Sequence, residues 1–363
     1  MTLNTLITIS LLSGLLWVQA AHAERQPVKA IYIPLADHYA AVIAYEKYRE
    51  QMKHADFSLE QMKNWDLLRA YYQSGEVDMA FVMSPLAMDM YNEKPTFRWV
   101  GLMHRDGNAL AINDLINQKV QLPKKRIDRK PDHKVAAAFS AFRQSRGKPT
   151  EIGMPHLMAT HSVVLYKYLK DNGLSMAIGR GKKEDVVIIG VAPPKSPTYL
   201  RKNNNRGRPA AFEQSLPWAD VVETQNFGHV AWYSKDVLPW KNGHVECIAL
   251  AQDKSIQEKE AAIREVIYFI HKAGQDIEQA RAQGGEALAN IADMVRKHIP
   301  EHNKAAIMQS LRLDLNVINY QHLNNDEAGL KVIMDLAVEA GIINQGVDIQ
   351  AFSDRRFSTT FSE

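Results

Sequence analysis

The stretch NWDLLRAYYQSGEVDMAFVMSPLA, Asn64–Ala87, decides the fold class of this chain. Its first half carries apolar residues at a helical period and ends at Gly75, a residue type that supplies the left-handed conformation common after a helix. The next residues, Val77–Met83, are almost continuously apolar, as in a strand that is covered on both faces. Ser84 then predicts a helix cap, with Pro85 at the first helical position. A helix, a buried strand and a second helix are therefore predicted in direct succession.

Such a strand delivers the N-terminal end of a helix to the carboxyl edge of its sheet. In open α/β sheets, ligands bind at this edge. The free N–H groups of a helix N-terminus favour an anion or a carbonyl oxygen there. A plain strand-to-helix connection explains these residues equally well, so the stretch predicts a place for a ligand and leaves its identity open.

Short apolar strands and helices alternate along much of the chain. The segment VKAIYIPLADHYA, which begins at Val28, predicts a strand followed by a helix, and FRWVGLMHR and ALAIN predict further strands. This alternation is typical of α/β proteins with largely parallel sheets. The 363 residues suffice for two domains that each bury a core.

Charge and cysteine content exclude several classes of protein. The formal net charge of +3 is too small to indicate a nucleic-acid partner, and the polar runs Gln121–Lys134 and Pro193–Pro209 predict surface loops. Cys247 is the only cysteine, so neither a disulfide nor a cysteine-rich metal site can form within one chain. Its apolar neighbours predict a buried and inert thiol.

The N-terminus has the pattern of a secretory signal peptide. An apolar stretch from Leu6 to Val18 precedes Ala21-His22-Ala23, an A-x-A cleavage pattern. We expect residues 1–23 to be removed, so that a periplasmic chain begins at Glu24. No later segment approaches 18 uninterrupted apolar residues, so no membrane span is expected.

Five segments resemble, in the same order, segments of nitrate- and bicarbonate-type solute-binding proteins. They are Asn64–Ala87, LMHRDGNALAIN, MATHSVVLYKYLKDNGL, DVVIIGVAPP and AAFEQSLPWAD. They lie between residues 64 and 220, and the resemblance extends over the whole mature chain. The chain thus resembles the nitrate, sulfonate, bicarbonate and thiamine-precursor (NMT1-like) group of periplasmic substrate-binding proteins of ABC importers.

The resemblance implies a type II periplasmic-binding fold, in which two α/β lobes close on a ligand by a hinge motion. Lobe 1 is expected at residues 24–112 and 228–363, and lobe 2 at residues 113–227. The implied function is capture of a small oxyanion, sulfonate or related nitrogen or sulfur compound for an ABC permease, by a monomer without a cofactor. Alternatively, the closed form is presented to a membrane sensor.

The same resemblance implies a set of ligand-binding residues. Trp65 corresponds to a tryptophan that packs on the ligand, and Asn108 to an amide that hydrogen-bonds it, while His161 is expected to donate to an oxyanion. The full set is Trp65, Ser84, Asn108, Thr160, His161 and Trp218. Core packing, turn formation or helix capping are the alternative roles of these residues. Leu216 stands where anion-binding relatives usually carry a charge, and Glu213 is three residues away, so nitrate itself is disfavoured.

An enzyme is the less favoured alternative. One branch of the superfamily makes a pyrimidine precursor with an iron-binding cysteine cluster, and a single cysteine cannot supply it. His298 and His302 have a metal-ligand spacing, but Pro300 between them disrupts a helix, which favours a surface loop. We therefore expect no catalytic residues and no metal ligands.

Overall fold

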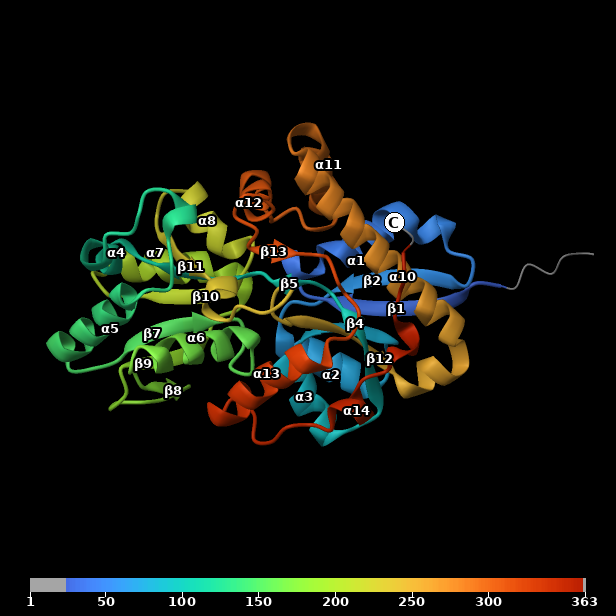
Figure 1. Ribbon diagram of the computed structural model, residues 1–363, viewed down its shortest axis with the longest axis horizontal. Coiled ribbons are helices and arrows are strands. Elements are labelled where there is room, and N and C mark those ends of the chain that lie inside the picture. Colours follow the sequence, from blue (N-terminus) through green and yellow to red (C-terminus); the bar gives the residue numbers. More distant parts are fainter. Residues whose placement is uncertain (1–23, 362–363) are drawn as a thin grey trace, which may run out of the picture.

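The protein has two lobes, each built on its own β-sheet. The computed structural model describes residues 24–361, so the predicted signal peptide lies outside the described residues. The two lobes lie side by side along the long axis of the molecule (Figure 1). The predicted α/β fold with two lobes is confirmed.

The sheet of lobe 1 has five strands in the order β2-β1-β3-β12-β4. Strands β1, β2 and β3 are parallel, and β12 runs antiparallel to both β3 and β4. The carboxyl ends of β1, β3 and β4 and the amino end of β12 therefore lie at one edge. The strands are β1 (Gln26–Tyr32), β2 (Ala55–Gln61), β3 (Met79–Met83), β4 (Phe97–Leu102) and β12 (Cys247–Gln252).

The sheet of lobe 2 has six strands in the order β11-β6-β10-β7-β9-β8. Strands β10, β7, β9 and β8 are parallel, and β6 runs antiparallel to β10 and β11. The strands are β6 (Asn108–Ile112), β7 (Thr150–Met154), β8 (Met176–Ile178), β9 (Val186–Gly190), β10 (Ala211–Ser215) and β11 (His229–Tyr233).

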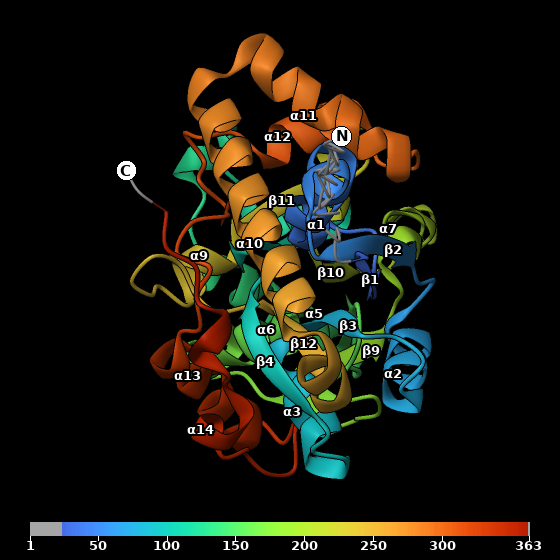
Figure 2. The same cartoon turned by 90° about the vertical axis from the view of Figure 1, so that its right-hand side faces the viewer.

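Helices cover both sheets. Figure 2 shows the long helix α10 running along lobe 1, where it packs on β1, β2, β4 and β12. The helices are α1 (Tyr39–Tyr48), α2 (Trp65–Ser74), α3 (Ser84–Glu93), α4 (Asp114–Val120), α5 (His133–Arg146), α6 (Thr160–Asp171), α7 (Ser196–Asn205), α8 (Trp218–Thr224), α9 (Ser234–Val237), α10 (Asp253–Gln283), α11 (Gly285–His298), α12 (Lys304–Ser310), α13 (Glu327–Glu339) and α14 (Ile349–Phe352). Short 3₁₀ turns are η1 (Ala36–His38), η2 (Arg49–Gln51), η3 (Arg126–Asp128), η4 (Pro193–Lys195) and η5 (Arg355–Phe357).

The lobe boundaries differ from the predicted ones. The prediction placed lobe 2 at residues 113–227 and so assigned β6 and β11 to lobe 1. These two strands pair with each other, however, and β6 also pairs with β10 of lobe 2. The chain therefore crosses between lobes before Asn108 and after Tyr233. An apolar strand has the same local pattern in either sheet, and only long-range pairing decides which one it joins.

The C-terminal part of the chain after α11, residues 299–361 (the tail), also contacts both lobes. Helix α12 packs on α8, and α13 packs on both α3 and α6, so neither belongs to lobe 1 alone. A short strand, β13 (Ile318–Asn319), pairs with β5 (Arg105–Asp106) in the first crossing segment. Arg105, which is buried, donates to the carbonyl oxygen of His322 and to the carboxylate of Asp326. These contacts hold the first crossing segment, around β5, against the tail.

The helix, strand and helix of the opening stretch form as predicted. Asn64 caps α2, because its side chain accepts a hydrogen bond from the Leu67 N–H at 2.8 Å, and Gly75 follows the helix with φ +82°. All five residues of β3 are buried. Ser84 does not cap α3, however: Met83 holds the cap position and Ser84 is the first helical residue. Its backbone N–H donates to the carbonyl oxygen of Glu246 on the neighbouring segment.

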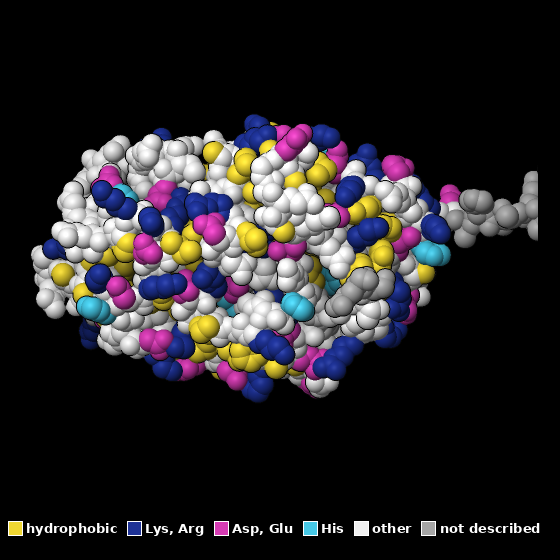
Figure 3. Space-filling model, turned by 45° about the horizontal axis from the view of Figure 1, so that its top comes forward, with side chains coloured by type: hydrophobic (Ala, Val, Ile, Leu, Met, Phe, Trp, Pro, Cys, Tyr) yellow, Lys and Arg dark blue, Asp and Glu magenta, His cyan; other side chains and the backbone are white. Residues whose placement is uncertain are grey.

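The surface carries both signs of charge. Lys and Arg side chains alternate with Asp and Glu over the face shown in Figure 3. In the basic segment 121–134, Arg126 is paired with Asp220 and Glu223, and Arg129 also contacts Glu223, so these arginines stabilise lobe 2. Within residues 24–361, no helix is both long and apolar enough to cross a membrane.

Candidate functional site

A cluster of buried polar side chains lies where the two sheet edges face each other. Lobe 1 contributes Asp37 from η1 after β1, Ser84 at the start of α3, His104 after β4, and Glu246 directly before β12. Each of these side chains is 0% exposed. The order of the sheet explains the grouping, because the ends of these strands meet at one edge.

Lobe 2 completes the cluster with residues at its own facing edge. The Ser215 hydroxyl, at the end of β10, donates to Asp37 Oδ2 at 2.7 Å and lies 3.0 Å from His161 Nε2. The Asn108 amide, at the start of β6, donates to Glu246 Oε1 at 3.5 Å. His161 Nδ1, near the start of α6, lies 3.5 Å from the same oxygen. Direct polar contacts thus join the lobes through this cluster.

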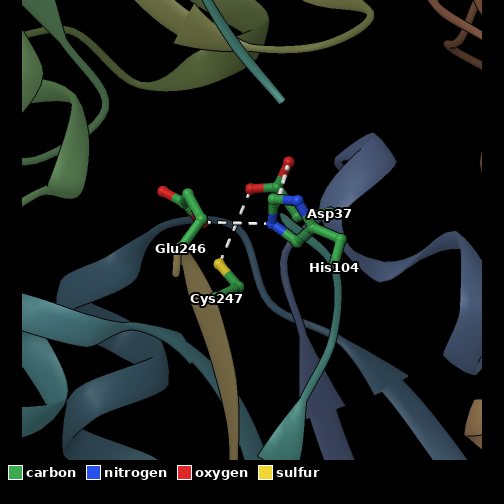
Figure 4. Close-up of side chains that lie close together, drawn as sticks. All are labelled: Asp37, His104, Glu246 and Cys247. Atoms are coloured by element: carbon green, nitrogen blue, oxygen red, sulfur yellow. Dashed lines mark hydrogen bonds and ion pairs between the residues drawn. The ribbon is translucent and has the colours of Figure 1, made fainter. Parts of the chain in front are cut away.

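His104 and two carboxyl groups form the centre of the cluster (Figure 4). His104 Nε2 lies 3.1 Å from Glu246 Oε2 and 3.7 Å from Asp37 Oδ1. The Cys247 thiol points toward the same carboxyl groups and donates to Asp37 Oδ2 at 3.6 Å. The chain thus buries one imidazole, two carboxyls and a thiol in contact with one another.

Burial and mutual charge set the protonation of these groups. Burial raises the pKa of Asp37 to about 7, with the charge of Glu246 acting in the same direction and that of His104 opposing it. Burial alone would raise the pKa of Glu246, but the hydrogen bond from His104 and the charges of His161 and His104 lower it to about 2. Burial lowers the pKa of His161 to about 4. At neutral pH, Glu246 is ionised and His161 is a neutral hydrogen-bonding group.

Several fully buried polar atoms beside this centre have no hydrogen-bond partner among residues 24–361. Both carboxyl oxygens of Glu213 are unpaired, and burial and the charge of Glu246 raise its pKa well above the ordinary value, which keeps it protonated. The other unpaired atoms around the cluster are Asp37 Oδ1, Ser84 Oγ, His104 Nδ1, Asn108 Oδ1, Thr160 Oγ1 and His161 Nδ1. Unpaired buried polar groups are rare in folded proteins and concentrate where water, an ion or a ligand binds.

Three of the residues predicted from the sequence surround Glu246. Ser84, Asn108 and His161 contact its backbone or carboxylate, and all three are fully buried. Thr160 is buried beside His161 at the start of α6, where Ala159 and not Thr160 holds the cap position. Its hydroxyl has no partner.

The two predicted tryptophans lie at the border of the cluster. Trp65 is buried, and its ring meets the ring of His38 edge-on at 6.2 Å. Trp218 bridges the lobes: its Nε1–H donates to the Pro34 carbonyl oxygen at 3.2 Å, and its ring packs on His302 at 5.1 Å. His302 is buried, so the predicted surface position for this residue is wrong. Tertiary contact with Trp218 covers it.

The central residues of the cluster were not singled out from the sequence. Asp37, His104 and Glu246 each stand beside a predicted strand, in LADHYA, LMHRDG and HVECIALA. The usable signal was a polar residue at the end of an apolar run, which marks a sheet edge. The sequence could not show that these ends meet, because strand order is set by long-range pairing.

The wider hollows of the surface lie elsewhere. One of about 820 Å³ is lined by Lys124, Arg126, Glu223 and Arg312, and another of about 490 Å³ by Asp106 and neighbouring residues of the tail. In the first, Arg126 and Glu223 are paired with each other. The buried cluster is the better candidate site, because several of its buried polar atoms are unpaired and its residues converge from both lobes.

The chain matches a known protein family and shares its fold with solved structures. The sequence profile of the NMT1-like family matches residues 21–292. A comparison with curated protein sequences finds no match. Many solved structures share the fold.

Two of the similar structures are binding proteins. One is the ligand-binding component of an ABC-type import system from Staphylococcus aureus, crystallised with zinc bound, which is 18% identical with a TM-score of 0.70, over 92% of this chain and 98% of that one. Another is the periplasmic nitrate-binding protein NrtA from Synechocystis PCC 6803, which is 15% identical with a TM-score of 0.72, over 90% of this chain and 85% of that one.

A third similar structure is an enzyme. The desulfurization enzyme DSZB is 10% identical with a TM-score of 0.56, over 92% of this chain and 97% of that one. At these identities the similarity establishes the fold, and the activity has to be argued from the site.

Proposed function

The chain belongs to the NMT1-like family, and from this membership we propose that it is the ligand-binding component of an ABC importer. The observation that carries the proposal is the buried cluster between the lobes. Its polar atoms converge from both sheet edges, and hydrogen bonds such as Ser215 to Asp37 close across the lobe boundary. A site of this kind encloses a small ligand by lobe closure.

The two crossings provide the hinge for this closure. The chain passes between the lobes at residues 103–107 and again after α9, and Arg105 fixes the first crossing to the tail. A ligand that contacts both edges favours the closed form by its difference in affinity for the two states. Contacts outside the cluster, such as Trp218 to Pro34, belong to the closed form and stabilise it without touching the ligand.

The charges of the cluster restrict the chemistry of the ligand. The ion pairs of Asp37 and Glu246 among the described residues involve histidines only, with no Lys or Arg. Leu216, at the position of the charge in anion-binding relatives, is buried, and its carbonyl oxygen accepts from the Ala36 N–H at 2.7 Å. We propose a ligand that presents positive charge or hydrogen-bond donors to the carboxyls. The helix N-termini at Ser84 and Thr160 suit a carbonyl or other acceptor on the same ligand.

We propose binding and not catalysis at this site. The one thiol, Cys247, is fully buried, and burial together with the charges of Glu246 and Asp37 raises its pKa well above the ordinary value. A thiol must ionise to act as a nucleophile. Alkylation of the folded chain by iodoacetamide at pH 8 is therefore expected to be slow, and rapid stoichiometric labelling of Cys247 would favour an enzyme.

Membership of the family also suggests where the protein acts and what it delivers its ligand to. We propose that residues 1–23 direct export, that the mature chain acts as a monomer in the periplasm, and that it delivers its ligand to an ABC permease. Size-exclusion chromatography with light scattering of residues 24–363 tests the monomer. N-terminal sequencing of the exported chain tests cleavage before Glu24.

A thermal-shift panel tests the binding function. The mature chain is melted with amines, aminopyrimidines, amides, alkylsulfonates, nitrate and bicarbonate. A ligand at a hundredfold excess over its Kd stabilises the folded state by about 2.7 kcal/mol, or roughly 4 °C in Tm for a chain of this length. A rise with the donor-bearing compounds supports the proposal, and a rise with nitrate alone overturns the proposed ligand chemistry.

Variants of the cluster connect binding to these residues. His161→Ala, Asn108→Ala and Trp65→Ala are expected to weaken binding by at least tenfold in calorimetry, because each removes a buried partner from the site. His133→Ala is the matched control, since His133 lies exposed at the start of α5. Unchanged affinity in a variant removes that residue from the site.

A further inference from the structure

Four side chains of metal-binding types, two carboxyls, one imidazole and one thiol, meet at the lobe 1 edge of the cluster. One ligand atom each from Asp37, His104, Glu246 and Cys247 lies within 4.8 Å of every other. All four side chains are fully buried, and they point toward one another in Figure 4. They come from three separate parts of the chain, so no local spacing in the sequence shows the set.

Two of the distances are near the edge lengths of a metal tetrahedron. With bonds of about 2.0–2.3 Å to N, O and S, a tetrahedral zinc ion separates its ligand atoms by about 3.3–3.7 Å. His104 Nε2 lies 3.1 Å from Glu246 Oε2 and 3.7 Å from Asp37 Oδ1. Cys247 Sγ lies 3.6 Å from the other oxygen of Asp37. The ligand atoms of all four residues lie within 4.8 Å of one another, so side-chain rotations are needed to bring them to these edge lengths around one ion.

The charges of the cluster call for a cation. Two carboxyls and a thiol face the imidazole of His104, with His161 Nδ1 3.5 Å from Glu246 on the other side, and Asp37 Oδ1 is fully buried without a hydrogen-bond partner although it faces His104. Burying carboxylates next to each other is costly unless positive charge compensates them. A divalent cation supplies that charge at the point where the four ligand atoms converge.

We propose that Asp37, His104, Glu246 and Cys247 bind a divalent transition-metal cation of the zinc class in tetrahedral geometry. The inference rests on the proposed binding function and deepens it, because it names the chemistry that the lobe 1 side of the cleft recognises. A mixed N, O and S ligand set suits zinc, whereas magnesium and calcium require six or more oxygen ligands.

Lobe 2 supplies the groups that orient these ligands. Ser215 donates to Asp37 Oδ2, and Asn108 donates to Glu246 Oε1, so each carboxylate keeps its other oxygen for the cation. Such outer contacts fix a ligand's orientation and contribute tenfold to hundredfold to metal affinity. Because they come from the opposite lobe, cation binding and lobe closure are coupled.

The test measures metal binding directly on the mature chain, residues 24–363. The protein is stripped with a chelator, reloaded with zinc, dialysed, and its metal content is measured by mass spectrometry, with the zinc Kd from competition with a chromogenic chelator. We expect one zinc per chain. Cobalt loading adds a spectroscopic readout, namely visible bands of tetrahedral cobalt and a thiolate-to-cobalt charge-transfer band in the near ultraviolet.

Variants separate a ligand from a merely structural residue. Cys247→Ser is expected to lose the charge-transfer band, and Cys247→Ser and His104→Gln each to weaken zinc binding by at least about a hundredfold. His271→Gln is the control, since His271 is also buried but lies in α10, bonds to Thr359 and is not one of the four converging residues. Circular dichroism and melting in chelator establish that each variant folds. Spectra and affinities of both ligand variants equal to wild type would overturn the proposal.

The solute panel, repeated in chelator, distinguishes this proposal from the binding function itself. If an organic solute stabilises the chain in chelator and the protein binds no zinc, the proposed importer function stands and the proposed cation site is overturned. One zinc per chain, with a smaller radius of gyration in solution scattering when it is bound, supports the cation and its coupling to closure. Stabilisation by neither zinc nor any solute overturns both.

Discussion

The burial of His302 by the opposite lobe has a measurable consequence for stability. Its Nδ1 lies 2.8 Å from the Tyr39 hydroxyl and its Nε2 lies 3.0 Å from the Pro34 carbonyl oxygen. Trp218 of lobe 2 covers its ring. Burial lowers the pKa of His302 from 6.5 to about 3, although the hydrogen bond to Pro34 opposes the shift. The replacement His302→Gln keeps one donor and one acceptor and removes the titration.

The sign and size of the effect follow from these values. Because the pKa in the folded state lies below 6.5, the unfolded chain binds the proton more tightly. The stability that neutral His302 contributes is complete above pH 6.5 and is lost as the pH falls toward 3. Between pH 7.5 and pH 5, this single group lowers the free energy of unfolding by about 2 kcal/mol.

Urea unfolding of residues 24–363 at the two pH values measures this loss. We expect wild type to lose about 2 kcal/mol more than His302→Gln between pH 7.5 and pH 5. His133→Gln, at an exposed position, controls for the removal of one imidazole and is expected to lose as much as wild type. Equal losses in wild type and His302→Gln would refute the reasoning, and would mean that the imidazole is hydrated and that the lobes do not close over it.

Three further predictions test the lobe contact, a turn and a buried ion pair. Ser215→Ala removes a hydrogen bond from lobe 2 to the buried carboxyl of Asp37. Such a bond to an ionised group contributes about 1.5–3 kcal/mol, so the closed form should be at least tenfold less populated. Ligand calorimetry and solution scattering measure this change. Gly243→Ala should destabilise the chain by about 1–3 kcal/mol more than Gly75→Ala in urea unfolding, because both residues have positive φ but only a Cβ at Gly243 overlaps a carboxylate. Arg126→Met leaves the fully buried Asp220 without its cation and should lower stability by about 3–5 kcal/mol in the same assay.

Each of these predictions has an outcome that contradicts it. Wild-type affinity in Ser215→Ala would show that the interlobe hydrogen bond does not contribute to closure. Equal stabilities of the two glycine variants would mean that the loop at Gly243 relaxes around a methyl group. For Arg126→Met, the exposed pair Lys130–Asp236 provides the comparison, and a loss no larger than that of Lys130→Met would refute the cost of the uncompensated carboxylate.

The sequence determined the local structure of this protein well. The left-handed residue Gly75 and the all-apolar strand β3 follow from chemistry acting over a few residues, and the structure contains both, whereas the predicted cap at Ser84 lies one residue too late. The alternation of strands and helices was enough to predict an α/β fold, and the resemblance to the family implied its two lobes. Order and spacing of the same segments predicted the family that the sequence profile matches.

Only the tertiary structure decided what the site is made of. Asp37, His104 and Glu246 are far apart in sequence, and they meet because β1, β4 and β12 end at one sheet edge. Which sheet β6 joins, and which residues of lobe 2 reach those carboxyls, depends in the same way on long-range pairing. Asn108 and His161 were singled out only through the resemblance to the family, and both lie beside Glu246. The central carboxyls and imidazole could not be predicted, since their function comes from contacts that no neighbouring residue specifies.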